Sequence, residues 1–311
     1  MKKYILSVLP LLALTLGFTS CDDDNAIKSE SIITADAYKQ NEFDKWLELN
    51  YILPYNIQFK YRYEEIESDF NYYTVPADME NSIIMAHLVK YLCIEAYNEV
   101  AGVHFTRRYF PKEFFLIGEF EYQNNGTMIL GTAEGGRKIL LAGINNLLKY
   151  TENLTNSEAL NHYYIKTIHH EFTHILNQVR NYPTSYKEVS GSKYVNDSWS
   201  EKPFNTAYLE RGFISAYSQK EAGEDIAEML SEYVTHSPEW WEKQMKAADA
   251  LWKDDPDQTV KGRVLIEQKL DILRGYLFDV FGMDIDDIRD AVNRRQNDVA
   301  AGKVNLTSIN L

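Results

Sequence analysis

The sequence predicts an α+β fold, with strands in the first half of the chain and helices in the second. Short apolar and aromatic runs, separated by Asn-Gly and Gly-Gly turn signals, mark the strands before residue 143. Apolar residues at helical spacing follow, from residue 157 to about residue 298. No internal repeat is present, so the strand-rich and helix-rich parts are expected to form one domain of mixed class.

The first 20 residues are predicted to be a processed leader that takes no part in the fold. Two lysines precede an apolar run, and small residues precede Cys21. This order resembles the signal of bacterial lipoproteins, although Phe18 stands where the commonest pattern has Leu or Val. Cys21 is therefore predicted to become the lipidated N-terminus. The alternative is ordinary secretion with an incidental cysteine.

Residues 21–35 are predicted to be an acidic flexible tether. The run Asp22–Asp24 keeps such a segment extended because like charges repel one another. With Cys21 lipidated, Cys93 stands alone and no disulfide framework is available. Cys93 lies in an apolar helical stretch, which is typical of a small buried hydrophobic residue. The folded domain is predicted to cover residues 36–311.

The elements of this domain are predicted in chain order. A short helix begins near Glu42, and alternating apolar residues predict a strand at 57–63. One long helix is expected over 78–100, ending near Gly102. Three strands should follow at 114–123, 127–132 and 138–143, with turns at Asn125-Gly126 and Gly135-Gly136.

The second half is predicted to be mainly helical. Thr155–Glu158 has the spacing of a capping box and is expected to open a helix that runs to about Val179. Residues 180–215 are expected to be rich in loops. Helices should fill 221–298, and the part beyond 238 forms a helical C-terminal portion with breaks near Pro238, Pro256 and Gly282.

The charge balance excludes nucleic acid as a partner. The chain has 32 basic and 46 acidic residues, a formal charge of −14. Such a chain offers no basic stripe that could neutralise phosphates.

The helix over 157–179 carries the motif HEFTH on the face opposite its apolar stripe. At 100° per residue, His170 lies about 200° and His174 about 240° from Ile168. The two histidines are therefore neighbours one turn apart and can converge on one ion. Glu171 points elsewhere and suits a general base. This pattern is typical of zinc hydrolases, and the alternative is two exposed polar histidines.

His169 lies about 100° from Ile168 and away from His170, so it is predicted to be structural. The stripe on which this geometry depends consists of Leu160, Tyr164, Ile168, Ile175 and Val179.

A catalytic zinc site still lacks a third protein ligand. The metzincin class has a histidine six residues after the second one, but here that position is Arg180, and Asn177 replaces the required glycine. The remaining solution is a carboxylate on a later helix. Glu224 and Glu228 are one turn apart in the segment 215–234, a spacing that suits one ligand and one acceptor for a histidine ring.

The competing interpretation of this segment is an ordinary amphipathic helix with a solvated acidic face. Two small residues beside the Glu224/Glu228 pair favour the close approach of another helix instead, namely Ala227 and Ser231.

HEFTH followed 50 residues later by Glu224 resembles the gluzincin metallopeptidases. The local pattern is similar to the catalytic domain of anthrax lethal factor. Together with the signal, the chain resembles the zinc-binding metallopeptidase lipoproteins of Bacteroidetes, which are associated with TonB-dependent SusC/SusD-type nutrient import. The resemblance covers the signal and about residues 155–235, and it implies a zincin-like fold, one zinc ion and peptide or protein substrates.

The resemblance also implies a role for each matching residue. His170, His174 and Glu224 would bind zinc, and Glu171 would be the general base. Tyr217 would stabilise the oxyanion, with a core tyrosine as the alternative. Glu228 would orient His170 or His174.

Two functions of different classes follow from these residues. The first is a zinc peptidase tethered to the outer membrane, with the cell surface as a further expectation. The second is a non-catalytic binding lipoprotein that keeps the fold. Since Glu171 and three candidate ligands are all present, the sequence favours the enzyme. His236 is the alternative third ligand if Glu224 is not one.

Overall fold

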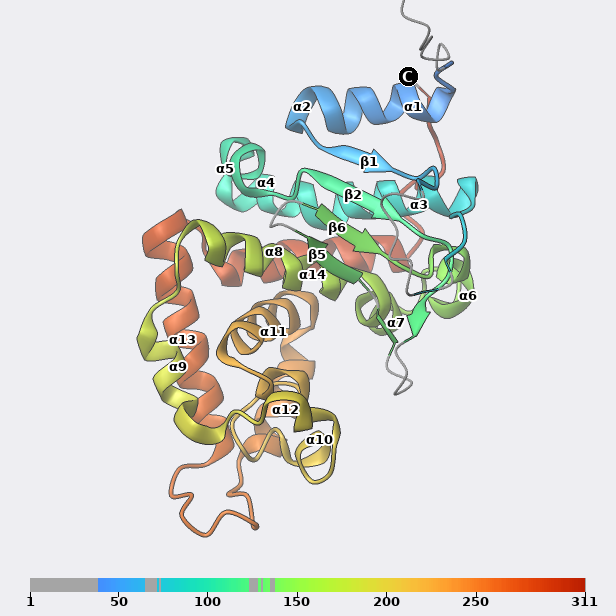
Figure 1. Ribbon diagram of the computed structural model, residues 1–311. Helices are drawn as coiled ribbons and strands as arrows, with labels where there is room; N and C mark the ends of the chain where they lie inside the picture. Colours follow the sequence, from blue (N-terminus) through green and yellow to red (C-terminus); the bar gives the residue numbers. More distant parts are fainter. Residues whose placement is uncertain are drawn as a thin grey trace, which may run out of the picture. The chain divides into compact units, whose positions relative to one another are not determined.

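The computed structural model describes residues 39–64, 72, 74–122, 128–129, 131–134 and 138–310, and residues Asn41–Leu311 form one compact unit (Figure 1). The predicted leader and tether, Cys21, and the turns Asn125-Gly126 and Gly135-Gly136 lie outside the described residues. The domain boundary at residue 36 stays a prediction. Among the described residues, no helix combines the length and apolarity that a membrane span requires.

A small mixed sheet lies in the first half of the unit. Its strand order is β1-β2-β6-β5, with parallel pairing of β1 with β2 and of β2 with β6, and antiparallel pairing of β6 with β5 (Figure 1). A separate antiparallel pair joins β3 and β4. The strands are β1 (Gln58–Lys60), β2 (Glu113–Leu116), β3 (Glu121–Tyr122), β4 (Met128–Ile129), β5 (Gly131–Glu134) and β6 (Lys138–Leu141). The sheet and the many helices agree with the predicted α+β class.

The strand predicted over 114–123 is interrupted after β2. At Gly118 the backbone N–H donates to the carbonyl of Val75 at 2.7 Å. A Cβ at Gly118 would lie 2.4 Å from the carbonyl oxygen of Pro76, so only glycine fits this close approach. The pairing therefore changes partner here, and β3 belongs to the other sheet.

The long helix predicted over 78–100 is present and ends as expected. It runs continuously from α3 (Met79–Leu88) through a π-helical turn (Val89–Ile94) to α4 (Glu95–Ala101). Gly102 follows with a φ of 82°, which permits α5 (Val103–Tyr109) to start in a new direction. The short helix near Glu42 is also present, as α1 (Glu42–Leu47), a π-helical turn (Glu48–Ile52) and α2 (Leu53–Tyr55).

The HEFTH helix begins one residue later than its capping signature predicts. The side chain of Asn156, not that of Thr155, accepts from the N–H of Ala159 and opens α7 (Ser157–Leu160). A π-helical turn (Asn161–Ile165) then leads into α8 (Lys166–Val179). This turn contains one extra residue, which shifts the phase of the apolar stripe. After the turn, the stripe residues Ile168 and Ile175 are buried, whereas Val179, the last residue of α8, is 46% exposed.

The C-terminal half is helical and its breaks match the prediction. Pro238 is the first residue of α12, Pro256 lies between α12 and α13, and Gly282 caps α13 with a φ of 66°. The segment 180–215 is less irregular than predicted because it contains α9 and α10. The helices of this half are α9 (Thr184–Ser190), α10 (Phe204–Ala207), α11 (Ala222–Thr235), α12 (Pro238–Ala248), α13 (Gly262–Phe281) and α14 (Ile285–Ala300). A short helix α6 (Leu147–Tyr150) precedes them.

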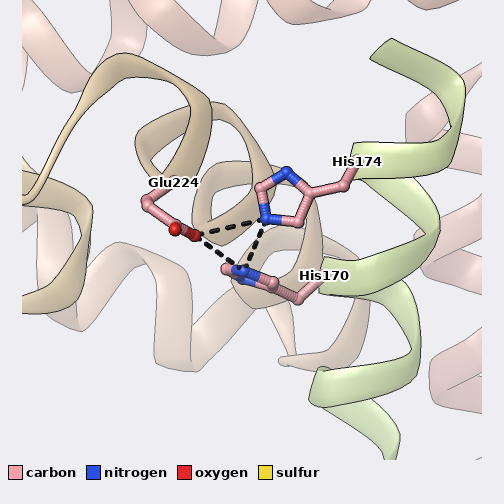
Figure 2. Close-up of side chains that lie close together, drawn as sticks. All are labelled: His170, His174 and Glu224. Atoms are coloured by element: carbon pink, nitrogen blue, oxygen red, sulfur yellow. Dashed lines mark hydrogen bonds and ion pairs between the residues drawn. The ribbon is translucent and has the colours of Figure 1, made fainter. Parts of the chain in front are cut away.

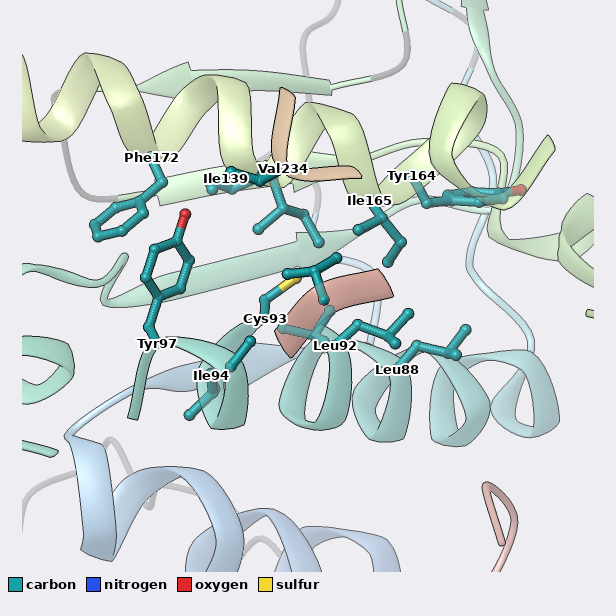
Figure 3. Close-up of a cluster of buried hydrophobic side chains, with 14 of the residues drawn as sticks. Leu88, Leu92, Cys93, Ile94, Tyr97, Ile139, Tyr164, Ile165, Phe172 and Val234 are labelled. Carbon is teal, nitrogen blue, oxygen red and sulfur yellow. The ribbon is translucent and has the colours of Figure 1, made fainter. Parts of the chain in front are cut away.

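The core lies between α8, the sheet and the long helix α3–α4. Figure 3 shows Phe172 of α8 and Ile165 of the preceding π-helical turn facing Tyr97 and Leu92 of the long helix, and all four side chains are fully buried. Cys93 is buried among them, as predicted. On its other side, α8 packs along α11.

Helix α11 is buried on nearly every face. It contacts α8, α14, α13 and the segment Tyr217–Gln219. Its apolar residues Ile226, Met229 and Leu230 are buried, but so are Glu228, Asp225 and Ser231. The interpretation of this segment as an amphipathic helix with a solvated acidic face is therefore wrong.

Candidate metal centre

Helix α8 presents two histidine side chains to the same point. His170 and His174 are one turn apart, and their Nε2 atoms are 3.1 Å apart (Figure 2). Their rings cross at 78°, so the two nitrogens converge while the rings avoid each other. His170 is buried and His174 is partly exposed, which leaves the site open on the His174 side. This is the shared face that the sequence predicts.

Helix α11 supplies the third atom from its first turn. Oε2 of Glu224 lies 3.1 Å from Nε2 of His170 and 3.2 Å from Nε2 of His174 (Figure 2). Among the residues that the structure describes, these three form the one group whose ligand atoms could hold a metal ion. The alternative ligand His236 is not part of this group. Its Nδ1 faces Glu232 at 3.2 Å and its ring stacks on Trp240.

The donor set and its spacing fit zinc. Ligand atoms about 2.0–2.2 Å from a tetrahedral zinc ion lie about 3.3–3.6 Å from one another. The three distances of 3.1–3.2 Å are close to that triangle. Two imidazoles with one carboxylate is also a donor set that catalytic zinc sites use.

The hydrogen-bond pattern around His170 independently calls for a cation. Its Nδ1 lies 2.8 Å from Oε1 of Glu228, and a carboxylate oxygen only accepts, so Nδ1 carries the hydrogen. In the neutral ring, Nε2 then presents a lone pair to a carboxylate oxygen of Glu224. Two acceptors face each other unless a proton or a metal ion lies between them.

The charges around His170 agree with this description. Burial alone would lower the pKa of His170, but hydrogen bonds to Glu224 and Glu228 raise it to about 9. Burial would raise the pKa of Glu224, but hydrogen bonds from the two histidines hold it well below its usual range. The pocket is therefore built to keep one positive charge between His170 and Glu224.

Glu228 sits behind His170 and is itself held by two further groups. Its Oε2 accepts from Oγ of Ser215 at 2.6 Å and from Nζ of Lys166 at 3.1 Å. Although burial raises the pKa of Glu228, the charge of Lys166 and the bond from His170 hold it well below its usual range. The sequence left open which histidine Glu228 contacts, and the structure shows that it is His170.

His169 is not part of the centre, as the sequence predicts. Its ring is fully buried, and Nδ1 bonds to the hydroxyl of Tyr97 at 2.9 Å. Burial lowers the pKa of His169 to about 3, so the ring stays neutral in the core. It serves the packing of α8 on the long helix.

The other two predicted residues lie close to the ligand group. The ring of Tyr217 is 6.0 Å from that of His170, and the ring of Trp199 packs against it in a T-shaped contact at 5.0 Å. Burial and the nearby Glu224 raise the pKa of Tyr217, so its hydroxyl keeps the hydrogen. Glu171 is partly buried, and its charge acts on both His170 and Tyr217.

Three residues near the centre were missed from the sequence: Lys166, Ser215 and Lys220. One of them had a spacing signal, because Lys166 lies one turn before His170 on the same side of α8. Lys220 lies four residues before Glu224, but Glu221 is extended and α11 begins only at Ala222, so helical spacing does not explain its position. Ser215 reaches Glu228 from a turn, and nothing in the spacing of the sequence indicates that contact.

Comparisons with known proteins agree with this geometry. Residues 36–286 match the model of a family described as "Putative zinc-binding metallo-peptidase". A crystal structure described in the same words, from Bacteroides caccae ATCC 43185, is 38% identical to this chain, with a TM-score of 0.72. The match covers 90% of this chain and 100% of that one. No curated protein matches.

Proposed function

The chain belongs to this family of zinc-binding metallo-peptidases, and on that premise we propose that it hydrolyses peptide bonds with one zinc ion held by His170, His174 and Glu224. The observation that carries the proposal is the convergence of two imidazole nitrogens and one carboxylate oxygen, from helices α8 and α11, within 4.8 Å. A zinc ion bound there would act as a Lewis acid and lower the pKa of a coordinated water to about 7.

Three side chains around this point would carry out the other steps of the reaction: Glu171, Tyr217 and Glu228. Glu171 accepts the proton of the attacking water and returns it to the leaving amine. Its position between the two histidines on α8, and its electrostatic effect on His170 and Tyr217, support this role. The hydroxyl of Tyr217 donates to the carbonyl oxygen that becomes negative in the transition state. Glu228 orients His170.

An extended peptide is the substrate shape that the surrounding fold favours. Strand β5 pairs with β6 on one side, and in the described part of the sheet no strand pairs with its other edge. The same strand contacts α8, which carries the two histidines. A peptide added to this edge would bring its main chain alongside the candidate centre.

The location of the enzyme is a proposal that rests on the sequence. The lipoprotein-like signal and the acidic run after Cys21 support a lipid-anchored protein of the outer membrane, exposed at the cell surface. Such an enzyme could deliver peptides to a TonB-dependent importer of the SusC/SusD type.

The experiment that tests the proposal compares the wild type with Glu171→Gln on a peptide library. The variant should keep one equivalent of zinc, because Glu171 is not among the three converging ligands. It should lose about 10²–10⁴-fold in kcat, the usual contribution of a general base. Equal cleavage by both proteins would refute the mechanism. Zinc binding without cleavage by either would favour the non-catalytic binding lipoprotein.

A further inference from the structure

Lys220 lies beside the metal centre, two residues before the start of α11. Its Nζ lies 3.2 Å from the hydroxyl oxygen of Tyr217 and 3.4 Å from Oε1 of Glu224. Its side chain is 31% exposed, while that of Glu224 is 12% exposed. One ammonium group thus joins the candidate oxyanion donor to a candidate zinc ligand.

We propose that Lys220 is a positioning residue that holds Glu224 as a one-oxygen ligand and aims the hydroxyl of Tyr217, an inference that rests on the proposed function. Lys220 acts first on the carboxylate of Glu224. Its Oε2 faces both histidines at 3.1 and 3.2 Å, while Oε1 is turned to Lys220. A carboxylate that bound through both oxygens would fill the position that a catalytic zinc keeps open for water. Lys220 keeps Oε1 out of it.

Lys220 also acts on the hydroxyl of Tyr217. A lysine ammonium has three donors and no acceptor, so in the pair with Tyr217 the phenol oxygen accepts. The phenol hydrogen is then directed to a different acceptor, and, besides burial, a hydrogen bond with Glu224 is one of the causes that raise the pKa of Tyr217. The rings of Trp199 at 5.0 Å and His170 at 6.0 Å pack against Tyr217 and limit the orientation of its phenol.

Simple charge neutralisation does not explain the position of Lys220. An exposed lysine paired with a carboxylate gains little free energy. Beside a site for a divalent cation, its positive charge opposes metal binding. The two hydrogen bonds of Lys220 instead orient the hydroxyl of Tyr217 and the carboxylate of Glu224.

The main chain around Lys220 is fixed independently of its side chain. The N–H of Val195 donates to the carbonyl of Gln219 at 2.8 Å, and the N–H of Asn196 donates to that of Lys220 at 3.1 Å. Replacing the side chain should therefore leave the path of residues 217–220 unchanged, and variants at this position should fold.

The first test uses the metal and needs no activity. Lys220→Met, Lys220→Arg and the wild type are loaded with Co²⁺, whose visible absorption weakens as the coordination number rises. Lys220→Met should bind cobalt and lose molar absorption because Oε1 of Glu224 joins the ion, and Lys220→Arg should restore it. Lys303→Met is the matched control, since Lys303 pairs with Asp298. A Lys220→Met spectrum identical to that of the wild type overturns the proposal.

The second test uses turnover in a double-mutant cycle with Tyr217→Phe. Lys220→Met should lower kcat about tenfold with KM unchanged. In the Tyr217→Phe background it should cause a clearly smaller loss, because part of its effect passes through the phenol. Fully additive losses overturn the Tyr217 half of the proposal. A wild type that binds cobalt but cleaves no peptide refutes the peptidase, and the cobalt spectra then decide the role of Lys220 alone.

Discussion

The ring of His170 can turn a lone pair toward a metal at Nε2 only while Nδ1 holds the hydrogen. Glu228 enforces that arrangement from 2.8 Å, and Lys166 and Ser215 enforce the orientation of Glu228 in turn. Lys166 therefore orients Glu228, and Glu228 in turn orients the ring of His170. A metal ligand in this protein is prepared by groups that never touch the metal.

Replacing Glu224 and Glu228 one at a time should show which of them binds zinc and which only orients a ligand. Glu224→Ala should lose zinc, because it deletes one of three converging atoms. Glu228→Ala should weaken zinc binding about 10–100-fold, the usual cost of losing a group that orients a ligand. Competition with a chromogenic chelator measures both affinities. Equal retention of zinc by the two variants would contradict the assignment of Glu224.

At this scale, the sequence predicts the parts of the site that lie within one helix. The spacing of His170, His174 and Glu171 fixes their faces once the helix is recognised, and the structure has the two histidines converging. The sequence could not predict the hydrogen bond from Ser215 to Glu228, because that contact depends on how a turn folds back over α11.

Among the elements, α11 departs furthest from its sequence pattern. Its acidic residues suggest a solvated face, yet Asp225 and Glu228 are buried because α8, α13 and α14 surround the helix. Each buried carboxylate has a cationic partner, Lys269 for Asp225 and Lys166 for Glu228. These lysines come from distant parts of the chain, so a pattern within α11 alone could not reveal the burial.

The ion pair between Asp225 and Lys269 holds α11 to α13 next to Glu224. The two groups are 2.7 Å apart and both side chains are fully buried. Burial raises the pKa of Asp225 and lowers that of Lys269, so desolvation outweighs their attraction. Removing one partner of such a buried pair strongly lowers the free energy of unfolding, whereas replacing both partners by apolar residues of similar volume changes it little.

Asp225→Ala should therefore cost about 3–5 kcal/mol of unfolding free energy, because it leaves the Lys269 ammonium buried without its partner. The double variant Asp225→Leu/Lys269→Met should recover most of that loss. Urea denaturation measures both.

The matched control for this prediction is Asp249→Ala. It breaks the ion pair with Lys261, in which both side chains are about half exposed. Its denaturation midpoint should stay close to that of the wild type. If Asp225→Ala destabilised the protein no more than this control, the buried pair would not hold the two helices together.

For the whole molecule, the sequence predicts the class of the fold but not its sheet order. Strand β1 pairs with β2, which lies more than 50 residues later in the chain, and β6 then pairs with β2 in the same direction. The long helix lies between β1 and β2 in the chain and provides the crossover that their parallel pairing needs. No local pattern in the three short strands encodes it.

The predicted lipid anchor is a property of the whole chain that can be tested directly. In a diderm bacterium, wild-type protein should sediment with membranes and incorporate radiolabelled palmitate. Cys21→Ser should do neither, because the thiol that would carry the lipid is absent. Its zinc content should match that of the wild type, since the three candidate ligands, His170, His174 and Glu224, are unchanged. Palmitate incorporation by Cys21→Ser would disprove the assignment.

The extra residue in the π-helical turn Asn161–Ile165 has a consequence for comparing this protein with others. The turn acts as a frame shift inside one continuous helix, since residues before and after it follow different helical phases. A relative without the turn would need a one-residue gap there to align correctly. An ungapped alignment anchored at Leu160 would match the buried His169 to that relative's metal-facing histidine. Such an alignment would assign the metal-binding role to His169, a core residue, in place of its neighbour His170.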